Sequence, residues 1–365
     1  DGHAARAYWL AAKGLVSDGQ IYGFFPGYRY TPITILLFVP YAYLPFSVVF
    51  VVQAVTAVLA AGGLGILTIS HIEDQGRILT QAERGLVLSF FLISSLSIPA
   101  YMQAQVNTHL ALLIAIGFVA FERDRDILSG SAFAIAALFK AIPAIFGLWL
   151  LYRQGYRAVL TSISVGVTGL LLGVLLFGMD TTVIYFEILL TRAQIGNLAS
   201  ISSPETAYLT LKQPLAHFLP GLGDLTLTVL NIAPLILVVG FAFRYDQSHS
   251  TVQSQILSIL AISIAMLAGT LSYFYYSIYI MFPLVASLFL IENRITKSLL
   301  GAGTALLVAI FTAEDVAAVV QALPVPASLS DLIINISYIV MSIAPLPLLG
   351  VLSILVAMVY YYTQT

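Results

Sequence analysis

The chain has 365 residues, of which 60% are hydrophobic and only 9% are charged. Soluble domains carry about 25% charged residues, so this composition excludes an ordinary soluble protein and indicates one that crosses a membrane several times. The formal net charge of −2 provides no basic surface for nucleic acid, and the absence of cysteine excludes disulfides and thiolate chemistry.

Residues 1–31 are predicted to form a loop on the outer face of the membrane, after a first transmembrane helix that would precede Asp1. In that position the Asp1 carboxylate is a candidate general base towards a hydroxyl. The stretch "GYRYTP" (27–32) places Arg29 between Tyr28 and Tyr30. Tyrosines are typical of membrane interfaces, whereas a guanidinium is suited to phosphate oxygens, and both readings stay open.

A helix that crosses a membrane needs about 20 mostly apolar residues. The clearest predicted spans are 46–69, 158–177, 226–243, 254–272, 274–291, 298–313 and 335–361, the last interrupted by Pro345 and Pro347. Less regular apolar segments come in two pairs, 86–98 with 105–121 and 127–139 with 143–152. The proline-rich segment 32–45 is short enough to be re-entrant. The predicted fold is an all-α polytopic transmembrane bundle of about ten to twelve membrane segments.

Basic residues in short loops indicate the cytoplasmic side. They gather at 122–126, 152–157, 243–246 and 292–297, and all four loops can be cytoplasmic only if 127–152 enters and leaves on one side. Pro143 disfavours a continuous helix there. We therefore expect a hairpin whose tip points outward, with the 178–222 segment also outside and an interfacial helix over 181–194.

Lys140 lies at the tip of that expected hairpin. On a straight helix it would be about 20 Å from either end, too far for a side chain that reaches about 6 Å. A cation within the membrane indicates a functional site with an anionic partner. We favour a phosphate as that partner, with a structural carboxylate as the alternative.

Two further stretches carry polar side chains at the starts of helices. "MQAQVNTH" (102–109) supplies Gln103, Gln105, Asn107 and His109, which either cap the helix or line a cavity that binds sugar hydroxyls or a phosphate. "LSYFYYSIYIMFP" (271–283) is a tyrosine cluster, suited to packing at the interface or to sugar contacts.

Four stretches, in this order, carry a family resemblance: "YWLAAKGLVSDGQIY" (8–22), "YRYTPITILLFVPYAYLPF" (28–46), "QVNTHLALLIAIGF" (105–118) and "LFKAIPAIFGLWLLYRQGYRAV" (138–159). They resemble the GT-C superfamily of polyprenyl-phosphate-sugar-dependent membrane glycosyltransferases. The most similar branches are the mycobacterial-type polyprenol-phosphate-mannose α-mannosyltransferases and the first mannosyltransferase of GPI-anchor synthesis. The likeness extends over roughly residues 1–160; beyond them only the pattern of loops and helices agrees.

The resemblance implies an inverting transfer of a hexose, expected to be mannose, from a polyprenyl (dolichyl) phosphate to a lipid or glycan acceptor on the extracytoplasmic side of the cell membrane. Lys140 and Arg29 would bind the donor phosphate, and Asp1 would be the catalytic base. The substrate-binding candidates are Gln103, Gln105, Asn107, His109, Tyr30, Asn197, Tyr275 and Tyr276. The sequence identifies no cofactor and no metal-ligand set, although a divalent metal ion is compatible with the reaction.

The alternative function is a transporter or flippase for an anionic or lipid-linked solute, which would use the same cations. Transporters commonly contain internal repeats with paired broken helices. The sequence has one strong break, at 140–143, and no counterpart in the other half, which favours the enzyme.

Overall fold

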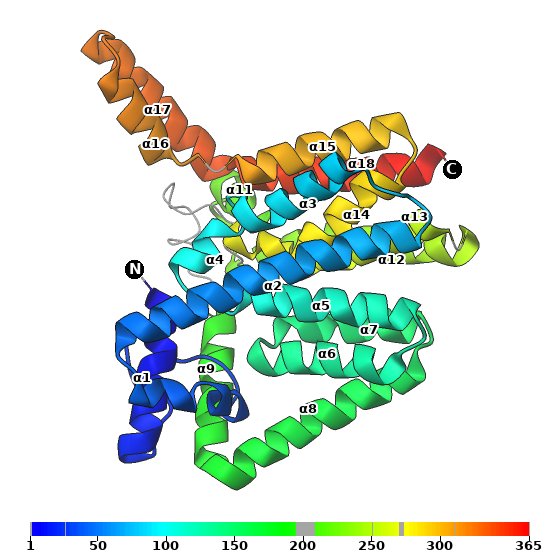
Figure 1. The fold of residues 1–365 in the computed structure, drawn as a ribbon. Coiled ribbons are helices and arrows are strands. Elements are labelled where there is room, and N and C mark those ends of the chain that lie inside the picture. The colour runs from blue at the N-terminus through cyan, green and yellow to red at the C-terminus, as the bar shows by residue number, and fades with distance from the viewer. Residues whose placement is uncertain are drawn as a thin grey trace. The chain divides into compact units, whose positions relative to one another are not determined.

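The computed structural model describes residues 2–25, 27–194, 209–249, 251–269, 274–309 and 311–364. Every regular segment in these ranges is a helix (Figure 1), which confirms the all-α prediction. The chain divides into two compact units, Asp1–Ile195 and Gly196–Thr365.

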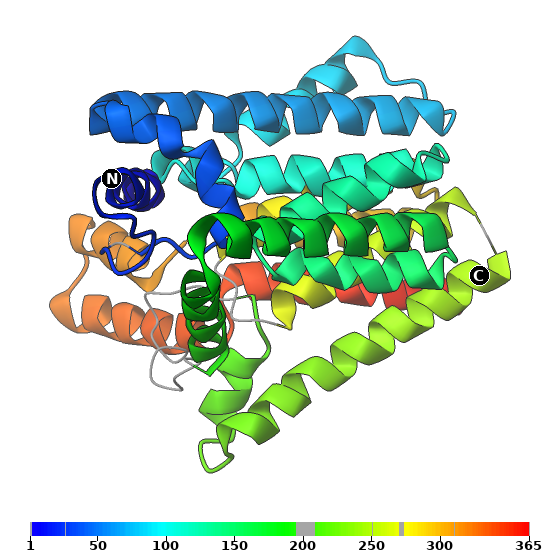
Figure 2. The same ribbon diagram turned by 90° about the horizontal axis from the view of Figure 1, so that it is seen from below.

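The first unit contains most of the predicted site residues. Its elements are α1 (His3–Asp18), η1 (Pro32–Leu37), η2 (Val39–Tyr43), α2 (Phe46–Asp74), α3 (Gln81–Ile93), α4 (Ile98–Met102), α5 (Asn107–Glu122), α6 (Asp126–Phe139), η3 (Ile142–Ile145), α7 (Phe146–Tyr152), α8 (Tyr156–Phe177) and α9 (Met179–Gln194). Figure 2 shows α2 and α5 running side by side, as their contacts require. The helix expected at 181–194 is present as α9.

The segment 1–31 is not simply a loop, because it contains α1. Alanine favours the helix, and Ala5, Ala11 and Ala12 are buried on a face that packs against η2 and α2. The helix ends at Gly19, whose positive φ of 71° closes the last turn. The prediction missed α1 because its small residues give a weak hydrophobic signal.

Among the described residues, four helices are long and apolar enough to cross a membrane: α2, α8, α12 (Asp224–His249) and α18 (Leu346–Gln364). A fifth span is possible if α15 (Arg294–Val308) and α16 (Ala313–Ala322), bent by 72°, are counted together. Several shorter apolar helices accompany them. The structure therefore agrees with a membrane protein. The number of membrane segments, ten to twelve, stays a prediction.

The break expected near Lys140 is present. Helix α6 ends at Phe139, and Lys140 is extended, with φ −136° and ψ 126°. The chain then turns through η3, which begins with Ile142 and Pro143, into α7. Packing of Phe118 on α5 against Phe146 and Trp149, with ring centroids 5.0 and 4.8 Å apart, fixes the returning segment.

Helix α6 also packs closely against α8. A Cβ atom on Gly130 would lie 2.2 Å from the Ala158 carbonyl oxygen, so the contact requires glycine. Ser162 on α8 donates a hydrogen bond of 2.8 Å to the Gly130 carbonyl.

The second unit is also built of helices, several of which overlap the predicted spans. Its elements are α11 (Lys212–Phe218), α12, α13 (Val252–Ala268), η4 (Phe274–Ile280), α14 (Met281–Leu290), α15, α16, α17 (Ala327–Ile343) and α18. The interruption expected near Pro345 is confirmed, because α17 and α18 are separate helices. Gly303 and Gly350 let α15 and α18 touch, since a Cβ on either would lie 2.7–2.8 Å from the other's carbonyl oxygen.

Candidate functional site

Three amide side chains and a lysine form a continuous hydrogen-bonded series in the first unit. Lys140 Nζ donates to Asn107 Oδ1 at 2.5 Å, Asn107 Nδ2 donates to Gln105 Oε1, and Gln105 Nε2 donates to Gln103 Oε1. We call Gln103, Gln105 and Asn107 the amide row. The break after α6 thus brings Lys140 to the start of α5, 33 residues earlier in the chain.

A tight turn between α4 and α5 aligns the amide row. Ala104 is buried and has a positive φ of 50°, and the Gln105 N–H donates to the Ala100 carbonyl at 2.8 Å. This left-handed residue lets the side chains of Gln103 and Gln105 meet although they are two positions apart. The sequence gives no sign of this geometry, because alanine is rarely found with positive φ.

The direction of the hydrogen bonds makes the row rich in donors. Each of the three amide oxygens accepts a hydrogen bond from within the series. The N–H groups that these bonds do not use are therefore the donors that the row offers to a ligand. An amide oxygen satisfies one hydrogen of the Lys140 ammonium without cancelling its charge. Asn107 is fully buried, whereas Lys140, Gln103 and Gln105 are only half-buried. Such a group suits a phosphate or hydroxyl oxygens.

The stretch that contains Arg29 and Tyr30 is attached to the end of α6. The Thr31 hydroxyl and N–H both donate to the Leu138 carbonyl, at 2.7 and 3.3 Å. The Tyr30 ring lies 5.8 Å from that of Phe139, which immediately precedes Lys140. Tyr30 is therefore close to the hairpin tip, while the Arg29 side chain is exposed on the same stretch.

Other tyrosines hold Tyr30 in place. Its hydroxyl bonds that of Tyr8 on α1 at 2.9 Å, and its carbonyl accepts from the Tyr22 hydroxyl at 2.6 Å. Burial raises the pKa of Tyr22, and burial also raises that of Tyr28, whose hydroxyl bonds Thr34 at 2.7 Å. These phenols stay protonated at neutral pH and act as structural hydrogen-bonding groups.

The first turn of α1 lies against the start of the amide row. Gly2 N–H donates to the Met102 carbonyl at 3.1 Å, and the N–H groups of Ala4 and Ala5 donate to the Gln103 carbonyl at 3.2 and 3.4 Å. These bonds satisfy donors that a helix start leaves open. Asp1, the predicted base, lies outside the described residues.

Four predicted site residues remain: His109, Tyr276, Asn197 and Tyr275. His109 is two positions after Asn107, about 200° around α5, and its shielded Nδ1 has no hydrogen-bond partner in the described part of the chain. Tyr276 belongs to the second unit, where its ring stacks on Tyr279 at 6.2 Å. Asn197 and the side chain of Tyr275 lie outside the described residues.

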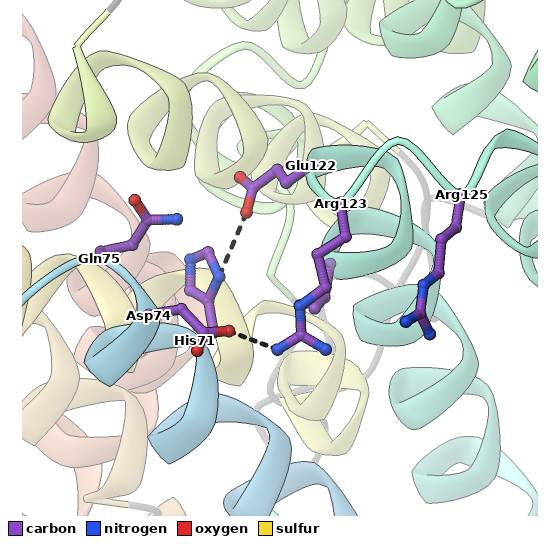
Figure 3. Close-up of a pocket in the computed structure, with 7 residues that line it drawn as sticks. His71, Asp74, Gln75, Glu122, Arg123 and Arg125 are labelled. Carbon is purple, nitrogen blue, oxygen red and sulfur yellow. Dashed lines mark hydrogen bonds and ion pairs between the residues drawn. The ribbon is translucent and has the colours of Figure 1, made fainter.

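The far end of α5 carries a polar cavity that the sequence did not suggest. Its volume is about 480 Å³, and it is lined by His71, Asp74, Gln75, Val119, Glu122, Arg123 and Arg125 (Figure 3). His71 Nδ1 lies 3.2 Å from Glu122 Oε2, and Arg123 pairs with Asp74. The available signal was the charged residues at the ends of α2 and α5 and just before α6.

This cavity is separate from the amide row. Asn107 and Glu122 are at opposite ends of α5, roughly 22 Å apart at the rise of an α-helix. His71 lies beside Glu122, and Arg123 pairs with Asp74 on the neighbouring helix end, so these polar groups have partners within the protein. We therefore place the candidate site at the row. Within the described ranges, no three His, Asp or Glu side chains are grouped to hold a metal ion.

The comparisons with known proteins give one match. The model of Glycosyltransferase family 87 matches residues 28–213, just over half of the chain. The matched range includes Arg29, Tyr30, the amide row and Lys140. No curated protein matches the chain, and no solved structure does.

Proposed function

The chain belongs to glycosyltransferase family 87, a GT-C-type family, and from that membership we propose that it transfers a hexose, expected to be mannose, from a polyprenyl phosphate to a lipid or glycan hydroxyl. The protein is a membrane glycosyltransferase. The proposal adds the donor, the sugar and the outer face of the membrane as the place of reaction. Family membership favours transfer over the transporter considered above.

The observation that carries the proposal is the row of amides that ends at the Lys140 ammonium. In a transfer from a polyprenyl phosphate, negative charge grows on the departing phosphate oxygen. A cation and N–H donors held in place before the reaction stabilise that charge more in the transition state than in the ground state. Half-burial of Lys140 leaves the ammonium accessible while strengthening its field relative to water.

The proposed step is a single inverting displacement. The acceptor oxygen bonds to the anomeric carbon as the bond from that carbon to the phosphate oxygen breaks. The electron pair leaves with the polyprenyl phosphate, beside Lys140 and the exposed Arg29. The acceptor's proton passes to a carboxylate, for which Asp1 is the proposed base. The bond from the Gly2 N–H to Met102 supports a base near the row.

The three amides of the row are proposed to have two different roles. Asn107 is fully buried and bonded to the lysine, so we assign it to holding Lys140 in position. Gln103 and Gln105 are half-buried and are the proposed contacts for the sugar hydroxyls or the phosphate. Tyr30 is proposed to contact the substrate beside the hairpin tip.

The test uses membranes that contain the full chain and a labelled polyprenyl-phosphate mannose, with the glucose analogue and a nucleotide-activated mannose in parallel. Label should move to a lipid or glycan from the polyprenyl donor alone. Lys140→Met should reduce transfer at least about 100-fold, the usual loss when one stabilising donor is removed. The matched control is Lys297→Met, which alters an exposed lysine on α15.

Two results would contradict the proposal. Transfer from the nucleotide sugar but from no polyprenyl phosphate sugar would replace the donor class. Full transfer by Lys140→Met, with Lys297→Met equally active, would remove Lys140 from the site. Lys140→Arg, which keeps the charge but changes its shape, should retain part of the activity and thereby distinguishes a lost charge from misfolding.

A further inference from the structure

A second cavity, which is not part of the proposed active site, lies between the first turns of α6 and α8. Its volume is about 460 Å³. It is lined by Asp124, Arg125, Asp126, Ile127, Leu128, Ser131 and Arg157; we call it the headgroup groove. The groove lies at the end of the α6–α8 pair, just before the close crossing of Gly130 and Ala158.

The groove contains charges of both signs in equal number. Arg125 and Arg157 supply two positive charges, and Asp124 and Asp126 supply two negative ones. None of the four takes part in an ion pair within the described part of the chain. Elsewhere in the same unit exposed arginines do pair, such as Arg77 with Glu83 at 3.0 Å, so these four groups remain available to a ligand.

The rest of the groove and its surroundings are apolar. Ile127 is 65% exposed and Leu128 46% exposed within the lining. Leu160, three residues after Arg157 on α8, is 63% exposed. The neighbouring Tyr156 is 62% exposed at the start of α8, the position of an interfacial aromatic ring. Charged groups therefore adjoin apolar surface at the end of two membrane helices. An amphiphile with a charged head and acyl chains matches both parts.

We propose that the headgroup groove binds one phospholipid whose headgroup carries both a phosphate and an ammonium. Arg125 and Arg157 hold the phosphate, since guanidinium groups bind phosphate oxygens well, and Asp124 and Asp126 accept hydrogen bonds from the ammonium. The acyl chains run along Ile127, Leu128 and Leu160. Basic pockets between membrane helices commonly bind anionic headgroups, but the two carboxylates here make a headgroup of zero net charge the better match. This inference does not depend on the proposed function.

The experiment is native mass spectrometry of the purified, delipidated full chain with phosphatidylethanolamine, phosphatidylcholine or phosphatidylglycerol added in detergent. Phosphatidylethanolamine should bind one to one and most tightly, because only its ammonium offers N–H donors to the carboxylates. The R125Q/R157Q double variant should bind it about 100-fold more weakly, at about tenfold per lost phosphate contact. The E292Q/R294Q variant, which alters exposed charges at the start of α15, is the matched control and should bind normally.

The D124N/D126N variant makes the proposal falsifiable even if the arginine variant does not fold. Removing two negative charges should reverse the preference, so that phosphatidylglycerol binds more tightly than phosphatidylethanolamine. Tighter binding of phosphatidylglycerol by the unaltered protein would overturn the inference, as would an equal loss in the control. Binding of free phosphoethanolamine as tightly as the whole lipid would exclude the acyl-chain contacts.

Discussion

Replacing Asn107 by leucine tests whether the amide row positions the Lys140 ammonium. The Asn107 side chain is fully buried, its Oδ1 accepts from Lys140 Nζ at 2.5 Å, and its Nδ2 donates to Gln105. Leucine is of similar size and has no polar atom in its side chain. The change therefore keeps the space filled and removes both hydrogen bonds.

The expected magnitude follows from the kind of bond that is lost. A hydrogen bond to a charged group contributes about 1.5–3 kcal/mol in soluble proteins, whereas bonds between membrane helices average about 0.6 and reach about 1.7 kcal/mol. The Lys140 bond is charge-assisted but half-buried, so its coupling energy should lie near about 1–1.7 kcal/mol. A lysine displaced by about 1 Å should lower kcat about 100-fold.

A double-mutant cycle measures this coupling. The unfolding free energies of Asn107→Leu, Lys140→Met and the double variant, compared with the unaltered protein, isolate the pairwise energy. The labelled-sugar assay gives kcat for the same four proteins, and the double variant should be no worse than Lys140→Met alone. A coupling energy within about 0.3 kcal/mol of zero, the usual scatter of additivity, together with normal kcat in Asn107→Leu, would refute the positioning role.

Three further changes have defined outcomes. Gly130→Ala should destabilise the protein by about 1–3 kcal/mol in chemical unfolding, because the new Cβ would lie 2.2 Å from the Ala158 carbonyl oxygen. The control Gly166→Ala, where the new Cβ would meet no atom within 4 Å, should not destabilise it. Equal effects of the two changes would contradict the close crossing of α6 and α8. Arg29→Gln should raise the donor KM about tenfold with an unchanged unfolding midpoint, since Arg29 is exposed, and an unchanged KM would remove it from the site. Burial raises the pKa of Tyr22 above its value in the unfolded chain, which is about 10. The contribution of Tyr22 to the free energy of unfolding should therefore be complete below about pH 10 and decrease above it. Tyr22→Phe should lessen the fall between pH 9 and 11 in thermal unfolding, and an unaltered fall would assign it to other groups.

The sequence predicted the parts of the fold that depend on local chemistry. The interruption at 140–143 follows from the missing donor and fixed φ of Pro143, and α6 ends at Phe139 as that constraint requires. The boundary between α17 and α18 follows from Pro345 for the same reason. The long helices were predictable because apolar runs of this length need no partner to be recognised.

The contacts that assemble the site were not predictable in the same way. The bond between Thr31 and Leu138 joins residues 107 positions apart, and no local pattern encodes it. The sequence grouped His109 with Gln103, Gln105 and Asn107 because of polarity alone. The structure separates them, because the row is aligned by the left-handed Ala104, whereas His109 follows the ordinary turn of α5.

Lys212 and Lys140 differ in the kind of oxygen that each ammonium contacts. Lys212 is buried in the second unit, where its Nζ lies 2.5 Å from an Asp224 carboxylate oxygen. That carboxylate cancels the charge, and the pair explains the lysine without a ligand. The Asn107 amide bonds Lys140 at the same distance but is neutral, so it directs the ammonium without opposing its field. Lys212 is thus explained by a carboxylate, whereas the bond from Lys140 to Asn107 involves a neutral oxygen and leaves the phosphate proposal open to the tests above.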